Sequence, residues 1–473
     1  MNRRILSLLF PAAMLGAACS HTSAAPGATA EAGTLQALRD GVVASSRALE
    51  TVQSLTDEAG PRLSGSPGNK AGVAWGLRAL GEAGLTKVHA EPCAVPHWER
   101  GVESGEITAP TPQPLMLAAL GGSVGTPPEG IEADVVEVGS LDALDKLDPR
   151  EVAGKIVFIY ARMERTRDGS GYGVAVRARG QGPSHAARAG AAGMLIRSVG
   201  TDENRAPHTG ALRYDEKVAK IPAAALANPD ADVLHRLLAR GQRVRVRMKL
   251  GATMLPDAEG ANVVGDVEGS AAPGEIVLLG AHLDSWDLGR GAIDDGAGVA
   301  IVTEAARQIG RLARHPRRTV RVVLFANEEN GLRGAHAYAA AHAAELGGHV
   351  LAVEADLGAG RVYEARFLGA PAAQPAFRAV AAAVEPLGAA SSADDAHGGS
   401  DLGPLLAAGV PILDLRQDAT EYFDFHHTAN DTIERVHKAE LDQAAAAFTA
   451  AAYAAADASA DFGRVPEDKR KRD

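Results

Sequence analysis

Ionisable side chains of the kinds that bind metals recur at the ends of apolar runs along this chain. His282 ends the run EIVLLGAH, Glu328 and Glu329 follow the run VRVVLFAN, and Asp356 ends the run HVLAVEAD. Asp294 lies in the loop between the first two runs, before an alanine-rich helical pattern. Imidazole and carboxylate groups are ligands that zinc and related cations take in hydrolases. The chemistry indicated is therefore metal-dependent hydrolysis.

A later segment, HHTANDT, adds His427 to this set. Two cations about 3.5–4 Å apart need a shared ligand that offsets their repulsion, with terminal ligands on each side. We expect Asp294 to be the shared ligand. His282 and Asp356 are expected on one ion, and Glu329 and His427 on the other.

Glu328 is then left without a metal to hold. A free carboxylate beside the attacking water can accept its proton and later pass it to the leaving amine, which is general acid/base catalysis. Asp284, which follows His282 closely, is expected to hydrogen-bond the far nitrogen of that imidazole and fix its orientation. Each residue alone has an ordinary explanation as a solvated charge or a satisfied core pair. Their joint order at strand ends favours a catalytic site.

The elements that must position these residues alternate between strand-like and helix-like patterns. The alternation runs from about Asn262 to the alanine-rich stretch KAELDQAAAAFTAAAYAAADA. It predicts an α/β fold with a mostly parallel or mixed sheet and helices on both faces. Ligands of such open sheets bind outside the carboxyl ends of the strands, where the candidate residues fall.

The chain divides into further blocks by the same patterns. We expect a first part of the catalytic domain over residues 34–109 and its main part, with the metal site, over 257–460. Residues 110–256 change to short strands and helices and contain no set of metal-type ligands in strand-end order. Residues 461–473 are expected to form a polar, solvated tail.

The motifs together resemble those of peptidase family M28, the zinc aminopeptidases with co-catalytic metals. The segments HLDSWDLGRGAIDDGAG, FANEENGLRGAHAY, EAD and YFDFHHTANDT look like the family's successive metal motifs, and GPRLSGSPGN resembles its amino-terminal signature. The resemblance implies a zinc-exopeptidase fold with an inserted β-rich protease-associated domain over residues 110–256, and the same metal and acid/base roles. The role of that domain is open between a packing lid and a device that restricts the cleft to short peptides. It also selects His427 over His426, because the family's last ligand lies four residues before the Asp of a DT pair, here Asp431.

The expected function is an exported exopeptidase that hydrolyses dipeptides or short peptides with a metal-activated water. Two divalent cations are expected. Zinc fits oxygen and imidazole ligands best, and manganese and cobalt are the alternatives. The expected partner is a small peptide substrate, and a homodimer is left open.

Three rival functions keep a similar fold. A glutaminyl-cyclase-like acyltransferase uses a single zinc, and the presence of both His282 and Glu329 argues against it. A receptor-like ectodomain without activity tends to lose ligands, whereas this chain keeps the full set. A two-metal deacylase carries its lid between the later ligands, and the gap from Asp356 to His427 is too short for one.

Composition agrees with an enzyme of more than one domain. The chain has 473 residues, of which 46% are hydrophobic, enough for a sizeable core. The formal net charge is −11 and the basic residues are scattered, so nucleic acid is not an expected partner.

The amino terminus predicts export. Arg3 and Arg4 precede an apolar run over residues 5–18, the order of a secretory signal, so residues 1–19 are expected to contain a signal peptide that is removed. Cys19 follows LGAA in a loose match to a lipoprotein signal, in which an acylated Cys19 becomes the first residue, and cleavage a little downstream is the alternative. The product is expected to be periplasmic, lipid-anchored to the outer membrane through Cys19, or secreted. Residues 20–33 are expected to be a flexible tether.

Overall fold

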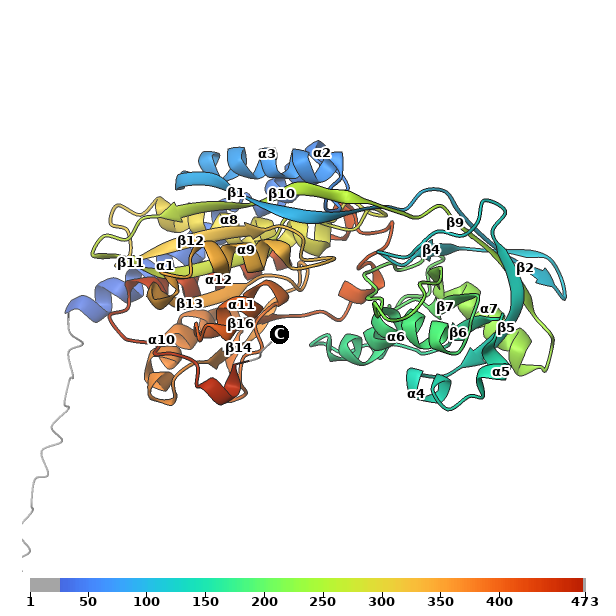
Figure 1. Ribbon diagram of the computed structural model, residues 1–473. Coiled ribbons are helices and arrows are strands. Elements are labelled where there is room, and N and C mark those ends of the chain that lie inside the picture. The colour runs from blue at the N-terminus through green and yellow to red at the C-terminus, as the bar shows by residue number, and fades with distance from the viewer. Residues whose placement is uncertain (1–25, 471–473) are drawn as a thin grey trace, which may run out of the picture.

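The computed structural model describes residues 26–470, so the predicted signal, Cys19 and the start of the tether lie outside the described residues. Two lobes, each built on an eight-stranded sheet, lie side by side (Figure 1). The long strands β1 (Thr86–Glu99) and β10 (Thr253–Val267) pair with each other and lead from one lobe to the other. Within the described residues, no helix has both the length and the apolar content needed to cross a bilayer.

The sheet of the first lobe has the order β1-β10-β12-β11-β13-β16-β14-β15. Besides β1 and β10, its strands are β11 (Ala272–His282), β12 (Arg318–Phe325), β13 (His349–Glu354), β14 (Val362–Leu368), β15 (Ala390–Ser391) and β16 (Ile412–Gln417). Strands β12, β11, β13 and β16 run parallel, whereas β10 and β14 pair antiparallel with their neighbours in this group. The predicted mixed sheet is confirmed.

Helices cover both faces of this sheet. They are α1 (Pro26–Ser45), α2 (Ala48–Glu58), α3 (Pro67–Glu82), α8 (Ala297–Gly310), α9 (Arg333–Ala341), α10 (Gln374–Val384), α11 (Gly403–Ala407) and α12 (Lys438–Asp457). Helices α9 and α11 share a core with one face, and the others pack into the core of the opposite face. The predicted helices on both faces are confirmed.

The sequence explains this layering. Along β11, Val277 and Leu279 enter one core while Ile276 and Leu278 enter the other, so a strand buried on both faces has a continuous apolar run as its sequence. Helix α12 is buried around almost its whole circumference. Its alanines let neighbouring elements approach closely, as expected for a helix that is apolar all round.

The second lobe carries the inserted domain. Its sheet has the order β3-β2-β9-β5-β6-β7-β8-β4, in which β5 to β8 run parallel. The strands are β2 (Glu103–Ala109), β3 (Gln113–Leu115), β4 (Leu117–Ala119), β5 (Ile131–Val138), β6 (Ile156–Ile159), β7 (Gly193–Arg197), β8 (Ala223–Leu226) and β9 (Arg245–Leu250). The helices are α4 (Leu141–Leu144), α5 (Pro149–Val152), α6 (Ser170–Arg188) and α7 (Asn228–Ala239).

Short turns of helix connect these elements. They are η1 (Ala292–Gly296), η2 (Leu346–Gly348), η3 (Pro371–Ala373), η4 (Glu385–Leu387), η5 (Ser400–Leu402), η6 (Tyr422–Asp424), η7 (Ile433–Arg435) and η8 (Glu467–Lys469).

The block boundaries differ in detail from those expected. Strand β2 starts at Glu103 and already belongs to the second sheet, so that lobe begins before residue 110. The chain enters the second lobe along β1 and returns along β10. Because these two strands pair antiparallel, both connections between the lobes lie side by side. Helix α1 begins at Pro26, so the later part of the expected tether is helical.

The carboxyl-terminal segment up to residue 470 is not the solvated tail that was expected. Phe462 and Val465 are each 1% exposed and join the cores of the first lobe. Arg464 donates to the backbone carbonyls of Leu346, His349 and Ala408. These two apolar side chains are enough to hold the segment against the first lobe. The prediction missed them because the segment is polar in overall composition.

Candidate metal centre

The candidate residues meet at the carboxyl edge of the parallel strands in the first sheet. His282 is the last residue of β11, Glu328 and Glu329 follow β12, and Asp356 follows β13. Because these three strands are parallel neighbours, their ends lie at one edge of the sheet. The structure therefore shows the expected convergence of strand-end residues.

Asp294 lies at the centre of this group. His282 Nε2 is 3.1 Å from Asp294 Oδ1, and His427 Nε2 is 3.2 Å from Asp294 Oδ2. The same two imidazole nitrogens approach one further carboxylate each. His282 Nε2 is 3.4 Å from Asp356 Oδ1, and His427 Nε2 is 3.0 Å from Glu329 Oε2.

His426 also lies in the centre, stacked on His427 with ring centroids 3.5 Å apart. Its Nε2 is 3.6 Å from Asp294 Oδ2, farther than His427 Nε2, and no contact joins it to Glu329 among the described residues. Of the two adjacent imidazoles, His427 therefore has the closer approach to two carboxylates.

The cluster of buried carboxylates carries more negative charge than its neighbours compensate. Burial, together with the nearby Asp294 carboxylate, raises the pKa of Glu329 well above its ordinary value. Oε1 of Glu329 is buried and has no hydrogen-bond partner in the described part of the chain. An uncompensated buried carboxylate oxygen is costly, and a coordinated cation removes that cost.

Several overlapping sets of side chains could hold a cation. Within residues 26–470, ligand atoms lie within 4.8 Å of one another in the sets Asp294, His426 and His427; His282, Asp295 and Asp356; and His282, Asp294 and Glu329. The donor chemistry of imidazole and carboxylate fits zinc-type cations.

Glu328 is half-buried at the edge of the group and lines the adjoining cleft. Burial, with the carboxylates of Asp356 and Glu329 nearby, raises the pKa of Glu328 to about 8. Its backbone N–H donates to Asp284 Oδ1 at 3.0 Å, which fixes the start of the turn that carries both glutamates. A carboxylate with a raised pKa at the rim of a metal group is suited to exchange protons with a substrate.

The expected role of the Asp284 carboxylate needs correction. Nδ1 of His282 is 3.1 Å from the backbone carbonyl oxygen of Asp284, whereas the nearest carboxylate oxygen is 3.8 Å away. The carboxylate instead accepts hydrogen bonds from the Glu328 N–H and, at 3.3 Å, from the Ser64 hydroxyl. The imidazole is held by the Asp284 backbone, because the turn after β11 folds that carbonyl back under the ring.

Two buried carboxylates that the sequence reasoning did not assign hold the backbone of the site. Asp431 accepts from the N–H groups of Ala292, Ile293 and Asp294 at 2.8, 2.7 and 3.3 Å. Asp295 accepts from the N–H of His282 at 3.0 Å. The Asp of the DT pair and the second Asp of IDDG were visible in the sequence, but no pattern of spacing says which amides they reach.

A buried arginine from the amino-terminal motif completes this support. Arg62, fully buried, donates to the backbone carbonyls of Leu283, Arg290 and Gly291 at 2.8, 2.7 and 2.9 Å. It therefore holds both ends of the loop between β11 and η1. The motif GPRLSGSPGN was the only sequence signal for it.

The inserted domain holds the backbone of the last histidines. The Thr209 N–H donates to the carbonyl of His427 at 3.0 Å, and Nδ1 of His208 lies 2.7 Å from the carbonyl of His426. Arg179, on α6, donates to the carbonyl oxygen of Thr209, which also lies 3.4 Å from Nδ1 of His427. The inserted domain therefore helps to shape the site as well as to cover it.

A cleft of about 860 Å³ opens beside the candidate residues and lies between the two lobes. Its first-lobe side carries acids, Asp294, Glu328, Glu329 and Asp356. Its inserted-domain side carries the cations Arg177, Arg179, Arg213 and Lys220 and one acid, Glu216. The volume falls in the range of small-molecule sites, and the inserted-domain side is positive on balance where the first-lobe side is negative.

Comparison with known proteins gives matches over nearly the whole chain. Residues 262–452 match the model of peptidase family M28, and residues 116–234 match that of the PA domain. Carboxypeptidase Q of Xenopus laevis is 38% identical over 414 residues, which cover 88% of this chain and 87% of the relative.

Solved structures agree with this match. The crystal structure of a peptidase M28 precursor from Shewanella amazonensis SB2B is 44% identical and has a TM-score of 0.91, covering 93% of this chain and 99% of its own. A zinc aminopeptidase from Bacillus subtilis has the same fold at 22% identity, with a TM-score of 0.63 over 89% of this chain and 97% of its own.

Proposed function

The chain belongs to peptidase family M28 and is a metallo-exopeptidase, and from that premise we propose that it hydrolyses dipeptides and short peptides at a centre of two zinc ions. The observation that carries this proposal is the position of Asp294 between two imidazoles, one at each of its carboxylate oxygens. A carboxylate approached in this way on both oxygens is suited to bridge two cations.

The ligand set is assigned from the same contacts. We assign His282 and Asp356 to one ion and Glu329 and His427 to the other, with Asp294 shared between them. When bound, the ions supply an activated water and polarise the scissile carbonyl. The assignment leaves Glu328 free of metal.

Glu328 is proposed as the general base and acid. It accepts a proton from the attacking water and donates it to the leaving amine, which balances the hydrolysis. Its raised pKa suits both steps, and bound cations would lower that pKa toward neutrality or below. Asp284 is proposed as a positioning residue that fixes the Glu328 backbone and, through its own carbonyl, the His282 ring.

The charges of the cleft support short substrates with a free carboxylate. Arg177 and Arg213 form no ion pair or side-chain hydrogen bond among the described residues, so they are available to a substrate carboxylate. The first-lobe acids are assigned to the ions and to proton transfer, so the cations of the inserted domain are the groups left to bind a substrate end. A dipeptide whose carboxylate pairs with these cations keeps its scissile bond within the cleft.

Export is proposed from the amino-terminal sequence alone. The charged and apolar order of residues 1–19 supports a secretory signal, and Cys19 offers a site for a lipid anchor. The product is then periplasmic, anchored to the outer membrane or secreted.

Cleavage of a dipeptide panel by the zinc-loaded full chain tests the function. Free dipeptides, amino-blocked dipeptides and dipeptide amides are compared, with and without a chelator. We expect Glu328→Gln to keep its zinc and to lower kcat by ~10²–10⁴-fold, since it keeps the shape and loses the proton acceptor. Wild-type activity in this variant contradicts the assignment, and release of pyroglutamate from glutaminyl substrates indicates the single-zinc cyclase instead.

A further inference from the structure

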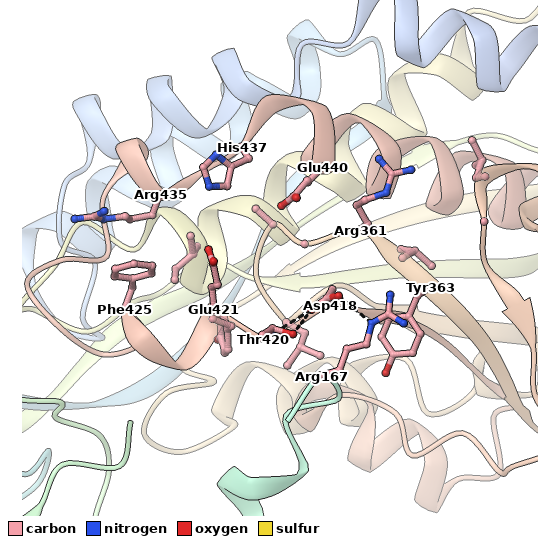
Figure 2. A pocket seen from close by; sticks show the side chains of 18 residues that line it. Arg167, Arg361, Tyr363, Asp418, Thr420, Glu421, Phe425, Arg435, His437 and Glu440 are labelled. Carbon is pink, nitrogen blue, oxygen red and sulfur yellow. Dashed lines mark hydrogen bonds and ion pairs between the residues drawn. The ribbon is translucent and has the colours of Figure 1, made fainter. Parts of the chain in front are cut away.

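A second cavity, of about 560 Å³, shares two lining residues, Leu357 and Tyr422, with the catalytic cleft. It is lined by the loop after β13, the start of β14, residues 418–425 and the start of α12 (Figure 2). Arg167 of the inserted domain closes one side. None of the side chains assigned to the metal centre lines it.

The rim of this cavity is fixed by paired charges. Arg167 Nε donates to Asp418 Oδ2 at 2.8 Å, and its guanidinium lies 3.9 Å from the centre of the Tyr363 ring. The guanidinium of Arg435 lies 4.5 Å from the centre of the Phe425 ring. The backbone N–H of Asp418 donates a hydrogen bond to the carbonyl of Arg361, and that of Ala419 donates to the carbonyl of Arg167, so the segments of the rim are linked. The cavity is therefore preformed and does not depend on loose side chains.

Charged side chains of both signs remain unpaired at the same cavity. No hydrogen bond or ion pair within residues 26–470 holds the side chains of Arg361, Glu421, His437 and Glu440. Figure 2 shows His437 and Glu440 projecting from the start of α12 and Arg361 from the start of β14. A ligand with only negative charge would meet Glu440, and one with only positive charge would meet Arg361. A zwitterion can satisfy both.

Apolar side chains lie beside these charges. Leu357 and Leu387 are half-buried and keep apolar surface free in the cavity, whereas Ile293 and Val362, at 4% and 1% exposed, form the wall behind it. A ligand that carries an ammonium, a carboxylate and an apolar group would match the charged and apolar parts of this lining. Free amino acids with aliphatic side chains have this chemistry.

We infer that this cavity is a second binding site, for a free α-amino acid with an apolar side chain. The inference rests on the proposed function, since amino acids are what peptide hydrolysis releases. Its carboxylate pairs with Arg361 and its ammonium with Glu440, and its side chain lies against Leu357 and Leu387.

A ligand bound in this cavity would affect the metal centre through the backbone, because residues that line the cavity are next to assigned metal ligands in the sequence. Ile293 is the residue before Asp294, and Leu357 is the residue after Asp356. Tyr422 and Phe425 belong to the segment that leads into His426 and His427. Product inhibition by the amino acid therefore has a non-competitive component in addition to competition in the cleft.

Equilibrium dialysis with radiolabelled L-leucine tests this site on the zinc-loaded full chain. The Glu328→Gln protein is expected to bind L-leucine at two classes of site. Arg361→Ala and the isosteric Glu440→Gln are each expected to weaken one class by at least ~tenfold, the usual effect of losing a charge-assisted hydrogen bond. The matched control is Arg378→Ala, because Arg378 is an exposed arginine on α10 that does not line the cavity.

Two analogues check the ligand chemistry. 4-Methylpentanoate lacks the amine and 3-methylbutylamine lacks the carboxylate, so each should compete for the second class at least ~tenfold more weakly than L-leucine. Zinc content and melting temperature confirm that the variants are folded. A single class of site, or two classes that both cavity variants leave unchanged, overturns the inference. So does equally tight binding of 4-methylpentanoate.

The failure of this inference is distinguishable from failure of the proposed function. If the cavity binds nothing, dipeptide hydrolysis by the wild-type protein persists while the second class of site is absent. If the chain does not hydrolyse peptides, the panel with wild-type protein is negative whatever the dialysis shows.

Discussion

The two sheets of this molecule have the same number of strands and a similar parallel segment, yet different kinds of residue stand at their strand ends. In the first sheet, β11, β12 and β13 are followed by or end in imidazole and carboxylate side chains. In the second sheet, β6, β7 and β8 end in Ile159, Arg197 and Leu226. The chemistry therefore depends on the residues at the strand ends and not on the sheet.

The lobe of the second sheet nevertheless stabilises part of the candidate metal centre. The loop after β7 supplies His208 and Thr209, which hold the backbone carbonyls of His426 and His427. One sheet provides the candidate ligands, and the other fixes the loop that bears the last of them. Variants can separate these two contributions.

The largest effect is expected when the negative charge of Asp294, the central residue of the candidate metal centre, is removed. Asp294→Asn keeps the shape of the shared ligand and loses half of its capacity to bridge, so zinc content should fall below two ions per chain. Activity should fall by more than ~10²-fold, since even a supporting partner of a ligand is worth ~10–100-fold. Elemental analysis and dipeptide hydrolysis measure the two effects.

The matched control removes a carboxylate from the second sheet's lobe. Asp232 pairs with Arg162 and Arg197 and does not line the catalytic cleft. Asp232→Asn should keep the zinc content of the wild type. Unchanged zinc in Asp294→Asn would contradict the bridging assignment, and zinc loss in Asp232→Asn would contradict the division between the sheets.

The same division explains how much of this arrangement the sequence could predict. The order of His282, Asp294, Glu328, Glu329 and Asp356 at strand ends is a local pattern, and parallel pairing alone brings such ends together. The fold class and the family resemblance rest on the same local motifs, and both are confirmed.

The supporting contacts could not be predicted because they depend on closure of the whole chain. Asp431 reaches the amides before Asp294, and Arg62 reaches carbonyls of the same loop, only after distant segments have packed. The Asp284 carboxylate was expected on the imidazole and instead holds Glu328, since the turn geometry decides which group faces the ring. The packing of the segment around Phe462 was not predicted, because burial of Phe462 and Val465 holds it on the first lobe although its overall composition is polar.

A smaller effect is expected when the support from the inserted domain is weakened. If His427 held a cation through Nε2, its Nδ1–H would face the Thr209 carbonyl that Arg179 also contacts. Nη1 of Arg179 itself lies 3.4 Å from that Nδ1, so the guanidinium packs against both groups. Arg179→Leu leaves that carbonyl less fixed and should weaken zinc binding by ~10–100-fold, the range for partners that orient a ligand. Competition with a zinc chelator measures the affinity. Recovery of affinity in Arg179→Lys would support positioning, and wild-type affinity in Arg179→Leu would rule it out.

Removal of the unpaired cations from the cleft should affect substrate binding alone. Arg177→Ala and Arg213→Ala are each expected to raise KM for free dipeptides by roughly tenfold, the effect of one charged hydrogen bond, and to leave kcat within about twofold. The matching dipeptide amides lack the carboxylate, so their KM should not change. Arg236→Ala, an exposed arginine on α7, is the control. Equal effects on dipeptides and their amides would contradict carboxylate recognition.

The smallest effect concerns the opposite edge of the first sheet, where a histidine serves packing and not chemistry. His349 begins β13, is fully buried, and its ring nitrogens lie 2.8 Å from the Tyr338 hydroxyl and 3.1 Å from the Glu345 carbonyl. Burial lowers the pKa of His349 to about 4. Between that value and the unfolded pKa of about 6.5, the unfolded chain binds a proton that the folded chain does not, so stability falls as pH falls.

This titration should lower the free energy of unfolding by about 2 kcal/mol between pH 7 and pH 5, from the usual ~1.4 kcal/mol for each unit of pKa shift. In His349→Gln that part of the slope should vanish, even if the variant is less stable at pH 7, because glutamine does not titrate. Denaturant unfolding of chelator-treated protein at both pH values measures it without interference from metal release. Since every other titrating group is common to both proteins, an identical slope would show that the folded and unfolded chains protonate His349 alike, so that burial does not lower its pKa. The contrast between an uncharged packing histidine at the amino edge and the charged groups at the carboxyl edge would then be lost.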